Sequence, residues 1–340
     1  MKMFTTVYFF ILFFSAALYG RDDFRVMFYN VENLFDTQDE PRKDDDEFLP
    51  EGNRHWNEWR YYKKLTAIAA VISAAGKAWT TPALVGLCEV ENDRVMTDLT
   101  GHPLLRKRRY RYIITDSPDI RGIDVALMYR PDKFGYIGHT SYSVRFPGNS
   151  AKETRDILHV TGVVGAGDTL DVFVCHFPSR RRGKLNSEFG RIHVASVIRD
   201  QVERLQRIRK DARIIIMGDF NDEPQDRSLR KTLGAGPVGA VVERDSLYNL
   251  FYRHVGGELG SYKHGKKWNV LDQLIVSGSL FDVRRFHVLR GSEQIFVRDF
   301  MLTGDRSAGR VRPNKTFFGF KYEGGYSDHL PIVVDFAVGK

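Results

Sequence analysis

The amino-acid sequence predicts a layered α/β fold. Short apolar runs of strand length recur along the chain, and they alternate with two longer segments that have helical periodicity. Several of the apolar runs end in a polar side chain, and in layered α/β folds ligands collect at strand ends. The 340 residues could form two average domains, but α/β sandwiches of this size often form one. We therefore expect a single domain over residues 21–340.

The first twenty residues differ from the rest of the chain. Lys2 is followed by an apolar run at residues 7–14, then by small residues at 15–17, and the polar sequence RDD begins at Arg21. This pattern predicts a cleaved secretory signal peptide over residues 1–20, and hence export to the periplasm or the cell exterior. The alternative is an uncleaved membrane anchor, although the run is short for a span of about 20 residues. After cleavage we expect no stable membrane association, and a monomer by default.

The composition is that of a globular protein with affinity for anions. The chain is 42% hydrophobic and 28% charged, has no repeat, and carries a net charge of +8. The positive charge is clustered in RKRRYR (106–111) and SRRRGK (179–184), which are either phosphate contacts or solvated surface. Cys88 and Cys175 each lie inside an apolar run, which favours two buried, unpaired thiols.

Two segments have the periodicity of amphipathic helices. Over residues 56–75, apolar side chains recur at i, i+3, i+4 and i+7, and Gly76 follows where a helix would end. Over residues 187–210, an apolar stripe runs as far as Ile208, with charged and amide side chains opposite. We predict a helix in each segment.

The strand candidates are mainly apolar runs of seven or eight residues, several of them ending in polar groups. They are FRVMFYN (24–30), ALVGLCEV (83–90), DVALMYR (124–130), ILHVTGVV (157–164), LDVFVCHF (170–177), IIIMGDF (214–220), VLDQLIVS (270–277) and PIVVDFAV (331–338). A single polar residue at a strand end is most simply explained by exposure of the strand end to solvent. Five sets with complementary chemistry indicate a site, and they are Asn30, Glu89, His176, Asp219 with Asn221, and Asp328 with His329.

These strand ends combine three kinds of chemistry. Glu89, Asp219 and Asp328 are hard oxygen ligands without a matching cysteine cluster, which suits Mg²⁺ or Mn²⁺. His176 and His329 are natural proton donors and acceptors near neutral pH. The amides can orient a carboxylate, a water or a phosphoryl oxygen without adding charge. Together these groups describe hydrolysis of a phosphate ester, with the basic clusters holding the rest of the substrate.

The same motifs, in this order along the chain, resemble those of the endonuclease/exonuclease/phosphatase superfamily. They are MFYNVENLFD, LVGLCEVEN, RGIDVALMYRP, VCHFPSR, IIIMGDFNDEP, WNVLDQLIVS and YSDHLP, and they extend from about residue 24 to 338. The resemblance implies a deoxyribonuclease I-like, four-layer α/β/β/α sandwich. In this fold two mixed β-sheets pack face to face between helices, and the active site lies at the strand ends on one rim.

The resemblance also implies a role for each motif residue. Glu89 and Asp328 match metal-site acids, and Asn30 matches the asparagine that helps to order the metal. One metal or two, and the identity of the general base, stay open.

For catalysis, the resemblance implies that Asp219 orients or deprotonates the attacking water and that Asn221 steadies the pentacovalent phosphate. His329 matches the C-terminal histidine with Asp272 as its carboxylate partner, and His176 matches a histidine that assists the leaving group or binds phosphate.

Substrate contacts and substrate class are less constrained. Arg155, Ser179 and Arg180 are candidates for phosphate binding, while Asp124 either contacts the site or bonds a loop. Basic charge and export favour a nuclease. The alternatives are a phosphatase or phosphodiesterase acting on inositol phosphates, sphingomyelin-type lipids or other small phosphoesters, and, more remotely, a non-catalytic binding module. The absence of a long aromatic hairpin in the sequence counts slightly against a lipid substrate.

Overall fold

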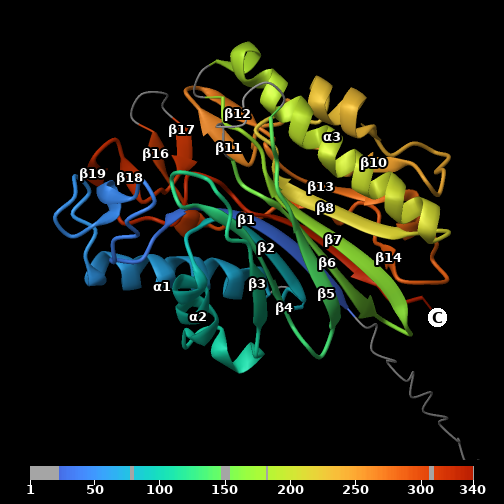
Figure 1. Ribbon diagram of the computed structural model, residues 1–340, viewed down its shortest axis with the longest axis horizontal. Helices are drawn as coiled ribbons and strands as arrows, with labels where there is room; N and C mark the ends of the chain where they lie inside the picture. Colours follow the sequence, from blue (N-terminus) through green and yellow to red (C-terminus); the bar gives the residue numbers. More distant parts are fainter. Residues whose placement is uncertain (1–22, 77–79, 147–153, 181–182, 306–309, 340) are drawn as a thin grey trace, which may run out of the picture.

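The computed structural model describes residues 23–76, 80–146, 154–180, 183–305 and 310–339. Over these parts the predicted four-layer sandwich is confirmed, because two β-sheets pack face to face and helices cover their outer faces (Figure 1). The predicted signal peptide lies outside the described residues. Within the described part, no helix is both long and apolar enough to cross a bilayer.

The first sheet has seven strands in the order β14-β20-β1-β2-β4-β3, and β15 also pairs with β20. Strands β1 and β2 are parallel, and their neighbours pair antiparallel. The bounds are β1 Phe24–Leu34, β2 Leu84–Val90, β3 Arg111–Ile114, β4 Asp124–Tyr129, β14 His287–Val288, β15 Gln294–Ile295 and β20 Ile332–Ala337.

The second sheet also has seven strands, in the order β5-β6-β7-β8-β13-β10-β9. Strands β7 and β8 are parallel, whereas β8 and β13 are antiparallel. The bounds are β5 Gly135–Tyr142, β6 Ile157–Val164, β7 Asp168–His176, β8 Arg213–Asp219, β9 Ala235–Gly236, β10 Leu247–Asn249 and β13 Asp272–Ser277. Three two-stranded hairpins project from one end: β11 Tyr262–His264 with β12 Lys267–Asn269, β16 Leu302–Asp305 with β17 Arg310–Pro313, and β18 Phe317–Phe318 with β19 Lys321–Tyr322.

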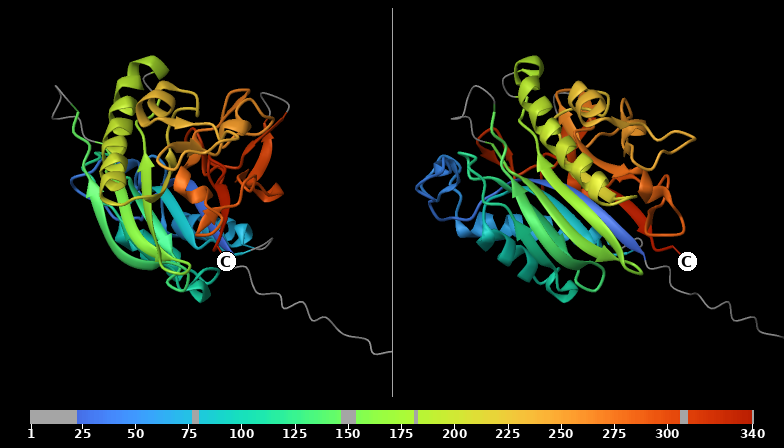
Figure 2. Two further views of the ribbon diagram at one scale, coloured as in Figure 1. Left: turned by 90° about the vertical axis from the view of Figure 1, so that its right-hand side faces the viewer. Right: turned by 45° about the vertical axis from the view of Figure 1, so that its right-hand side comes forward.

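Helices form the outer layers, as the turned views in Figure 2 show. The α-helices are α1 Glu58–Ala75 and α2 Asp93–Gly101, on the side of the first sheet, and α3 Lys184–Ile208, on the second sheet. Short 3-10 and π turns occupy η1 Asp46–Phe48, η2 Arg106–Arg108, η3 Ser228–Leu233, η4 Tyr252–His254, η5 Gly278–Phe281 and η6 Asp299–Met301.

Strand β8 illustrates how the layers pack. Successive side chains of a strand point to opposite faces. Ile214 and Ile216 therefore pack with α3, while Ile215 and Met217 lie in the core between the two sheets. A strand covered on both faces needs a continuous apolar run, which is what the sequence has at this position.

Both predicted helices are present. Asn57 caps α1 by accepting a hydrogen bond from the Arg60 amide at 3.1 Å, and Gly76 follows its last residue. Helix α3 begins three residues before the predicted start and ends at Ile208. That side chain is 68% exposed, so its predicted place on the apolar stripe was wrong: the chain becomes extended at Arg209.

The two cysteines are free and buried, as expected. Cys88 faces the core between the sheets, whereas Cys175 packs under α3. The thiols therefore belong to different layers and do not pair.

Candidate active site

Strand pairing brings three of the predicted catalytic residues into one row. His176 ends β7, Asp219 ends β8, and Asp272 begins β13. Asp219 is the register partner of His176 on one side and of Asp272 on the other. Directly paired residues present their side chains on the same face of a sheet. The three side chains therefore face the same space.

Gly218 allows this row to form. A Cβ at this position would lie 2.3 Å from the carbonyl oxygen of Cys175 on β7. Only glycine lets β7 and β8 approach in this way one residue before Asp219.

Asn30 and Glu89 reach the same space from the first sheet. Asn30, near the end of β1, donates from Nδ2 to Asp219 Oδ2 at 3.1 Å and to Glu89 Oε1 at 3.3 Å. Its Oδ1 accepts from the Glu32 amide at 3.0 Å. Asn30 thus orients two carboxylates, which is the ordering role that the resemblance implied.

Glu89 lies at an irregularity in the strand pairing. The register of β2 with β4 shifts between Cys88 and Val90, and Glu89 has a φ of +62°. Bulges redirect side chains, and positive φ in a non-glycine residue stores strain that the surrounding structure must offset. The amide of Asn33 holds Glu89 Oε2 at 3.0 Å, which leaves Oε1 toward Asn30 and His176.

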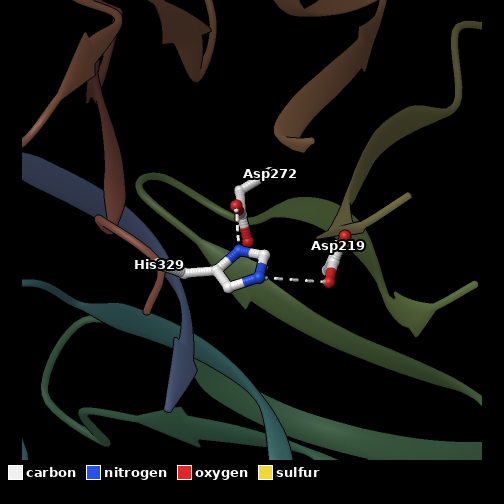
Figure 3. A group of neighbouring side chains, drawn as sticks. All are labelled: Asp219, Asp272 and His329. Carbon is white, nitrogen blue, oxygen red and sulfur yellow. Dashed lines mark hydrogen bonds and ion pairs between the residues drawn. The ribbon is translucent and has the colours of Figure 1, made fainter. Parts of the chain in front are cut away.

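His329 and Asp272 form a short, buried polar contact. His329 Nδ1 lies 2.6 Å from Asp272 Oδ2, and His329 Nε2 lies 3.8 Å from Asp219 Oδ2 (Figure 3). All three side chains are buried. Asp272 therefore fixes the ring and directs Nε2 toward Asp219.

The charges of this group alter its protonation. Burial alone would lower the pKa of His329, but the carboxylates of Asp272 and Asp219 raise it well above its usual value. Burial raises the pKa of Asp219 to about 6, although the positive charge of His329 opposes the shift. Burial, together with the positive charges of Arg155 and Arg121, lowers the pKa of His176 well below its usual value. The pKa values of the two histidines are therefore shifted in opposite directions, that of His329 toward the imidazolium and that of His176 toward the neutral ring.

Acidic side chains at this rim suit a divalent cation. Ligand atoms of Asp219, Asp272 and His329 all lie within 4.8 Å of one another, and Asp272 Oδ1 is buried without a hydrogen-bond partner. His329 can bind a cation only through a neutral ring nitrogen, so its raised pKa disfavours this group. Asp328 is close enough to Glu89 that burial and this second negative charge both raise its pKa. A cation would relieve the repulsion between these carboxylates, so the residues present fit Mg²⁺ or Mn²⁺.

Asn221 is placed by the chain immediately after β8. Its φ is +48°, its amide donates to Asp219 Oδ1 at 2.9 Å, and its Nδ2 donates to the Phe177 carbonyl at 3.1 Å. Phe220, between Asp219 and Asn221, is fully buried and packs against Phe177.

Most of the predicted catalytic residues line a cavity of about 600 Å³. Its lining combines acids and imidazoles with cationic, aromatic and amide side chains, namely Glu89, Arg121, His176, Ser179, Arg180, Gly183, Lys184, Asp219, Asn221, Tyr262, His264, Lys267, Asn269, Leu271, Asp328 and His329. The predicted substrate residues Ser179 and Arg180 are among them. Asn30 and Asp272 stand behind the lining residues.

Two of the predicted arginines also have structural partners. Arg155 is buried, pairs with Asp119 at 3.1 Å and donates to the Phe177 carbonyl at 2.7 Å. It does not line the cavity, so its role as a phosphate contact stays a prediction. Arg180 lines the cavity but also donates to the Asn221 carbonyl, and it pairs with Asp226 at 3.0 Å. Its first role is to hold the loop that carries Asn221.

Asp124 has a structural role, which is one of the two alternatives that the sequence left open. It accepts hydrogen bonds from Thr115 Oγ1 at 2.5 Å and from the Ser117 amide at 3.0 Å. It therefore fixes the loop before β4 and does not line the cavity.

Sequence reasoning missed several residues of the site. Tyr262 packs its ring 4.7 Å from that of His329 and forms an isolated β-bridge with it. Lys64 is buried behind the site, where its Nζ lies 3.7 Å from Glu32 Oε2. Its position among apolar side chains of the α1 stripe was a signal, because a lysine there needs a buried partner.

The fold and the site together define a phosphoester hydrolase built on two packed sheets. Residues 25–338 match the family model described as "Endonuclease/Exonuclease/phosphatase family", and the chain belongs to this family. No curated protein matches the sequence with significance.

Solved structures of low sequence identity share the fold. A family member from Bacteroides thetaiotaomicron has a TM-score of 0.59 at 17% identity, over 94% of this chain and 99% of that one. The mannosyl-6-phosphatase Bt3783 from the same species has a TM-score of 0.57 at 18% identity, over 92% and 99%. A D. rerio TDP2 complexed with a single strand DNA product has a TM-score of 0.55 at 15% identity, over 93% and 100%.

Proposed function

We propose that this protein is an exported, Mg²⁺- or Mn²⁺-dependent nuclease that hydrolyses phosphodiesters by in-line attack of an activated water. The observation that carries the proposal is the contact chain Asp272–His329–Asp219, of which His329 and Asp219 line a cavity that also has cationic side chains. A carboxylate, an imidazolium and an amide at one point are the groups that a phosphoryl transition state requires.

Each residue has a distinct task in this proposal. Asp219, with a pKa of about 6, accepts the proton of the attacking water. His329, held as an imidazolium by Asp272, donates from Nε2 to a phosphoryl oxygen and offsets its growing charge. Asn221 orients the same phosphoryl group. The neutral His176 donates a hydrogen bond from a ring N–H to the leaving oxygen, and that oxygen takes its proton from solvent as the ester bond breaks.

The residues that would hold the metal are Glu89 and Asp328, with Asn30 ordering Glu89. When bound, the cation supplies Lewis-acid stabilisation of the phosphoryl oxygens. Glu89 and Asp328 repel each other when both are charged. Removal of the cation should therefore leave this repulsion uncompensated and the enzyme inactive.

The positive charge around the cavity favours a nucleic-acid substrate. Arg121, Arg180, Lys184 and Lys267 border the cavity, and the chain has a net charge of +8. One structure of the same fold is complexed with a single strand DNA product. The second candidate is a phosphatase of small phosphoesters. It is favoured by the mannosyl-6-phosphatase with the same fold and by the polar wall that Tyr262, His264 and Asn269 give the cavity.

The test is a panel assay of the chain from residue 21 onward, with Mg²⁺ and with EDTA. The panel contains duplex and single-stranded DNA, RNA, an aryl phosphodiester, inositol phosphates, a sugar phosphate and sphingomyelin. EDTA-sensitive cleavage of nucleic acid supports the proposal. Turnover of the sugar phosphate alone would favour the phosphatase, and no turnover of any phosphoester would favour a binding module. Cell fractionation with N-terminal sequencing of the mature chain tests export.

A further inference from the structure

A surface of exposed rings and cations lies on the same rim as the cavity, outside the residues that line it. We call it the aromatic–cationic surface. It is formed by the first turns of α1 and by the β18–β19 hairpin, which appear at the left of Figure 1. Four large aromatic side chains are exposed there: Trp59 (63%), Tyr62 (52%), Phe318 (57%) and Phe320 (65%). Trp59 packs 6.0 Å from the Tyr322 ring of β19, which joins the α1 rings to the hairpin, while Phe318 lies on the other face of the hairpin, paired with Lys321. Exposed rings on adjoining elements mark an interaction site.

Cations are interleaved with these rings. Lys63 Nζ lies 4.9 Å from the Trp59 ring centre, Arg312 Cζ lies 5.0 Å from that of Phe318, and Lys315 Nζ lies 5.2 Å from the same ring. Arg312 is paired with Glu323 at 2.8 Å. Lys63 and Lys315 form no ion pair within 4.0 Å in the described part of the chain. The surface therefore has positive charge available for an anionic partner.

The hairpin is tied to the catalytic rim through buried contacts. The Thr316 amide donates to Glu32 Oε2 at 2.7 Å. Lys64, the neighbour of Lys63, donates to Thr316 Oγ1 at 2.5 Å and to the Tyr326 carbonyl at 2.7 Å. Tyr326 lies two residues before Asp328 in the chain. These contacts hold the hairpin and α1 in one fixed arrangement next to the cavity mouth.

Gly324 completes this arrangement. It has a φ of +67°, and a Cβ there would lie 2.7 Å from Lys63 Nζ. The glycine therefore leaves room for Lys63 to pass between the hairpin and α1, where its Nζ lies 5.5 Å from the Tyr322 ring centre.

We propose that the aromatic–cationic surface binds single-stranded nucleic acid that extends from the cavity. The bases would stack on Trp59, Phe318 and Phe320, and Lys63 and Lys315 would contact phosphates. Base–aromatic stacking combined with a cationic track is the physical basis of sequence-tolerant binding to single strands. This proposal rests on the proposed nuclease function, to which it adds the strandedness of the substrate and a binding site beyond the scissile phosphate.

A lipid surface is the alternative occupant, because rings can enter the membrane interface while lysine and arginine keep their charges among the headgroups. Nucleic acid is favoured by the cations that line the cavity, Arg121, Arg180, Lys184 and Lys267, because a polymer of phosphates can contact both these cations and those beside the exposed rings.

The test compares two surface variants with a matched control. Trp59→Ala removes the ring on α1, and the double variant Phe318→Ala/Phe320→Ala removes those of the hairpin. In the control, Tyr136→Ala, an exposed ring is removed from the start of β5. The Tyr136 register partner is Gly162, near the end of β6 that leads away from the site. Thermal unfolding confirms that each variant is folded, and the two surface variants test different elements should one fail to fold.

Binding is measured by fluorescence anisotropy in EDTA with labelled deoxythymidine oligomers of about 4 and about 16 nucleotides, the range of single-strand site sizes. We expect Kd for the longer oligomer to rise about fivefold to a hundredfold for each ring removed. The shorter oligomer, the Tyr136→Ala control and turnover of an aryl phosphodiester should show no change.

An unchanged Kd of the longer oligomer in both surface variants would overturn the proposal. So would ring-dependent binding to phosphatidylglycerol vesicles without ring-dependent binding to the oligomer. The outcome is separable from that of the nuclease assay. If oligomer binding depends on the rings but no nucleic acid is cleaved, the binding proposal stands and the nuclease proposal fails. If nucleic acid is cleaved but binding does not depend on the rings, the nuclease proposal stands and the binding proposal fails.

Discussion

Replacing Asp272 with asparagine removes a negative charge next to His329 and keeps the size of the side chain. The two side chains are buried and 2.6 Å apart, so the variant should retain the fold while changing the charge that the imidazole experiences. The prediction is a lower pKa for His329, hence a smaller share of the imidazolium, and with it a loss of turnover.

The size of the effect follows from the geometry. Two unit charges about 4 Å apart interact by about 4 kcal/mol at an effective dielectric constant of about 20. The substitution should therefore lower the pKa of His329, because it removes the largest of the charges that raise this pKa while burial continues to lower it. An asparagine in place of a carboxylate that orients a catalytic histidine has lowered turnover about 10⁴-fold in another enzyme class, which sets the scale here.

The assay has two readouts. NMR titration of the His329 ring in EDTA measures its pKa directly, and the pH profile of kcat measures its consequence, with the alkaline limb expected to move toward lower pH. Asp272→Glu is the control, because it keeps the charge. A His329 pKa that is the same in wild type and Asp272→Asn would refute the reasoning.

The same pair predicts how stability depends on pH. The pKa of His329 is raised in the folded state, so the pair stabilises the fold fully below the unfolded-state pKa of about 6.5. This contribution is lost as pH rises through the folded-state pKa. The free energy of unfolding, measured with urea, should therefore differ between wild type and Asp272→Asn at about pH 6.5 and converge at strongly alkaline pH.

Three further predictions concern other parts of the site. Asp219→Ala should lower turnover by several orders of magnitude with the fold intact, because the proton acceptor is lost; near wild-type kcat would exclude Asp219 from that role. Lys64→Met should destabilise the chain by about 3–5 kcal/mol in urea unfolding, since it leaves Glu32 buried without its cation, and a second change, Glu32→Gln, should restore part of the loss. Alanines at the three arginines of residues 180–182, of which the last two lie outside the described residues, should flatten the salt dependence of oligonucleotide binding; an unchanged slope would assign them to plain surface.

Much of the rim could be predicted from the sequence because the relevant residues end apolar runs. Asn30, Glu89, His176 and Asp219 each come within a residue of the predicted strand end, and the structure brings them together. A strand end is a local signal, and a rigid sheet then fixes where it lies. The pairing of Asp272 with His329, which are 57 residues apart, was predicted from the resemblance of the ordered motifs to a known family.

The residues that were not predicted from the sequence make contacts between segments that lie far apart in the chain. Lys64 meets Thr316 across 252 positions, and no local pattern indicates that a helix and a hairpin will meet. The aromatic–cationic surface escaped for the same reason, because its rings come from α1 and from the β18–β19 hairpin. The partners of Arg155 were hidden as well, since a buried arginine and a phosphate-binding one look alike in sequence.

The row formed by His176, Asp219 and Asp272 has a consequence for folding. Each member comes from a different strand, and the register of two strand pairs sets their alignment. A slip of one residue in either pair would turn a side chain to the opposite face of the sheet. Activity regained on refolding therefore reports more than recovered secondary structure: it requires that β7, β8 and β13 have all paired in the native register.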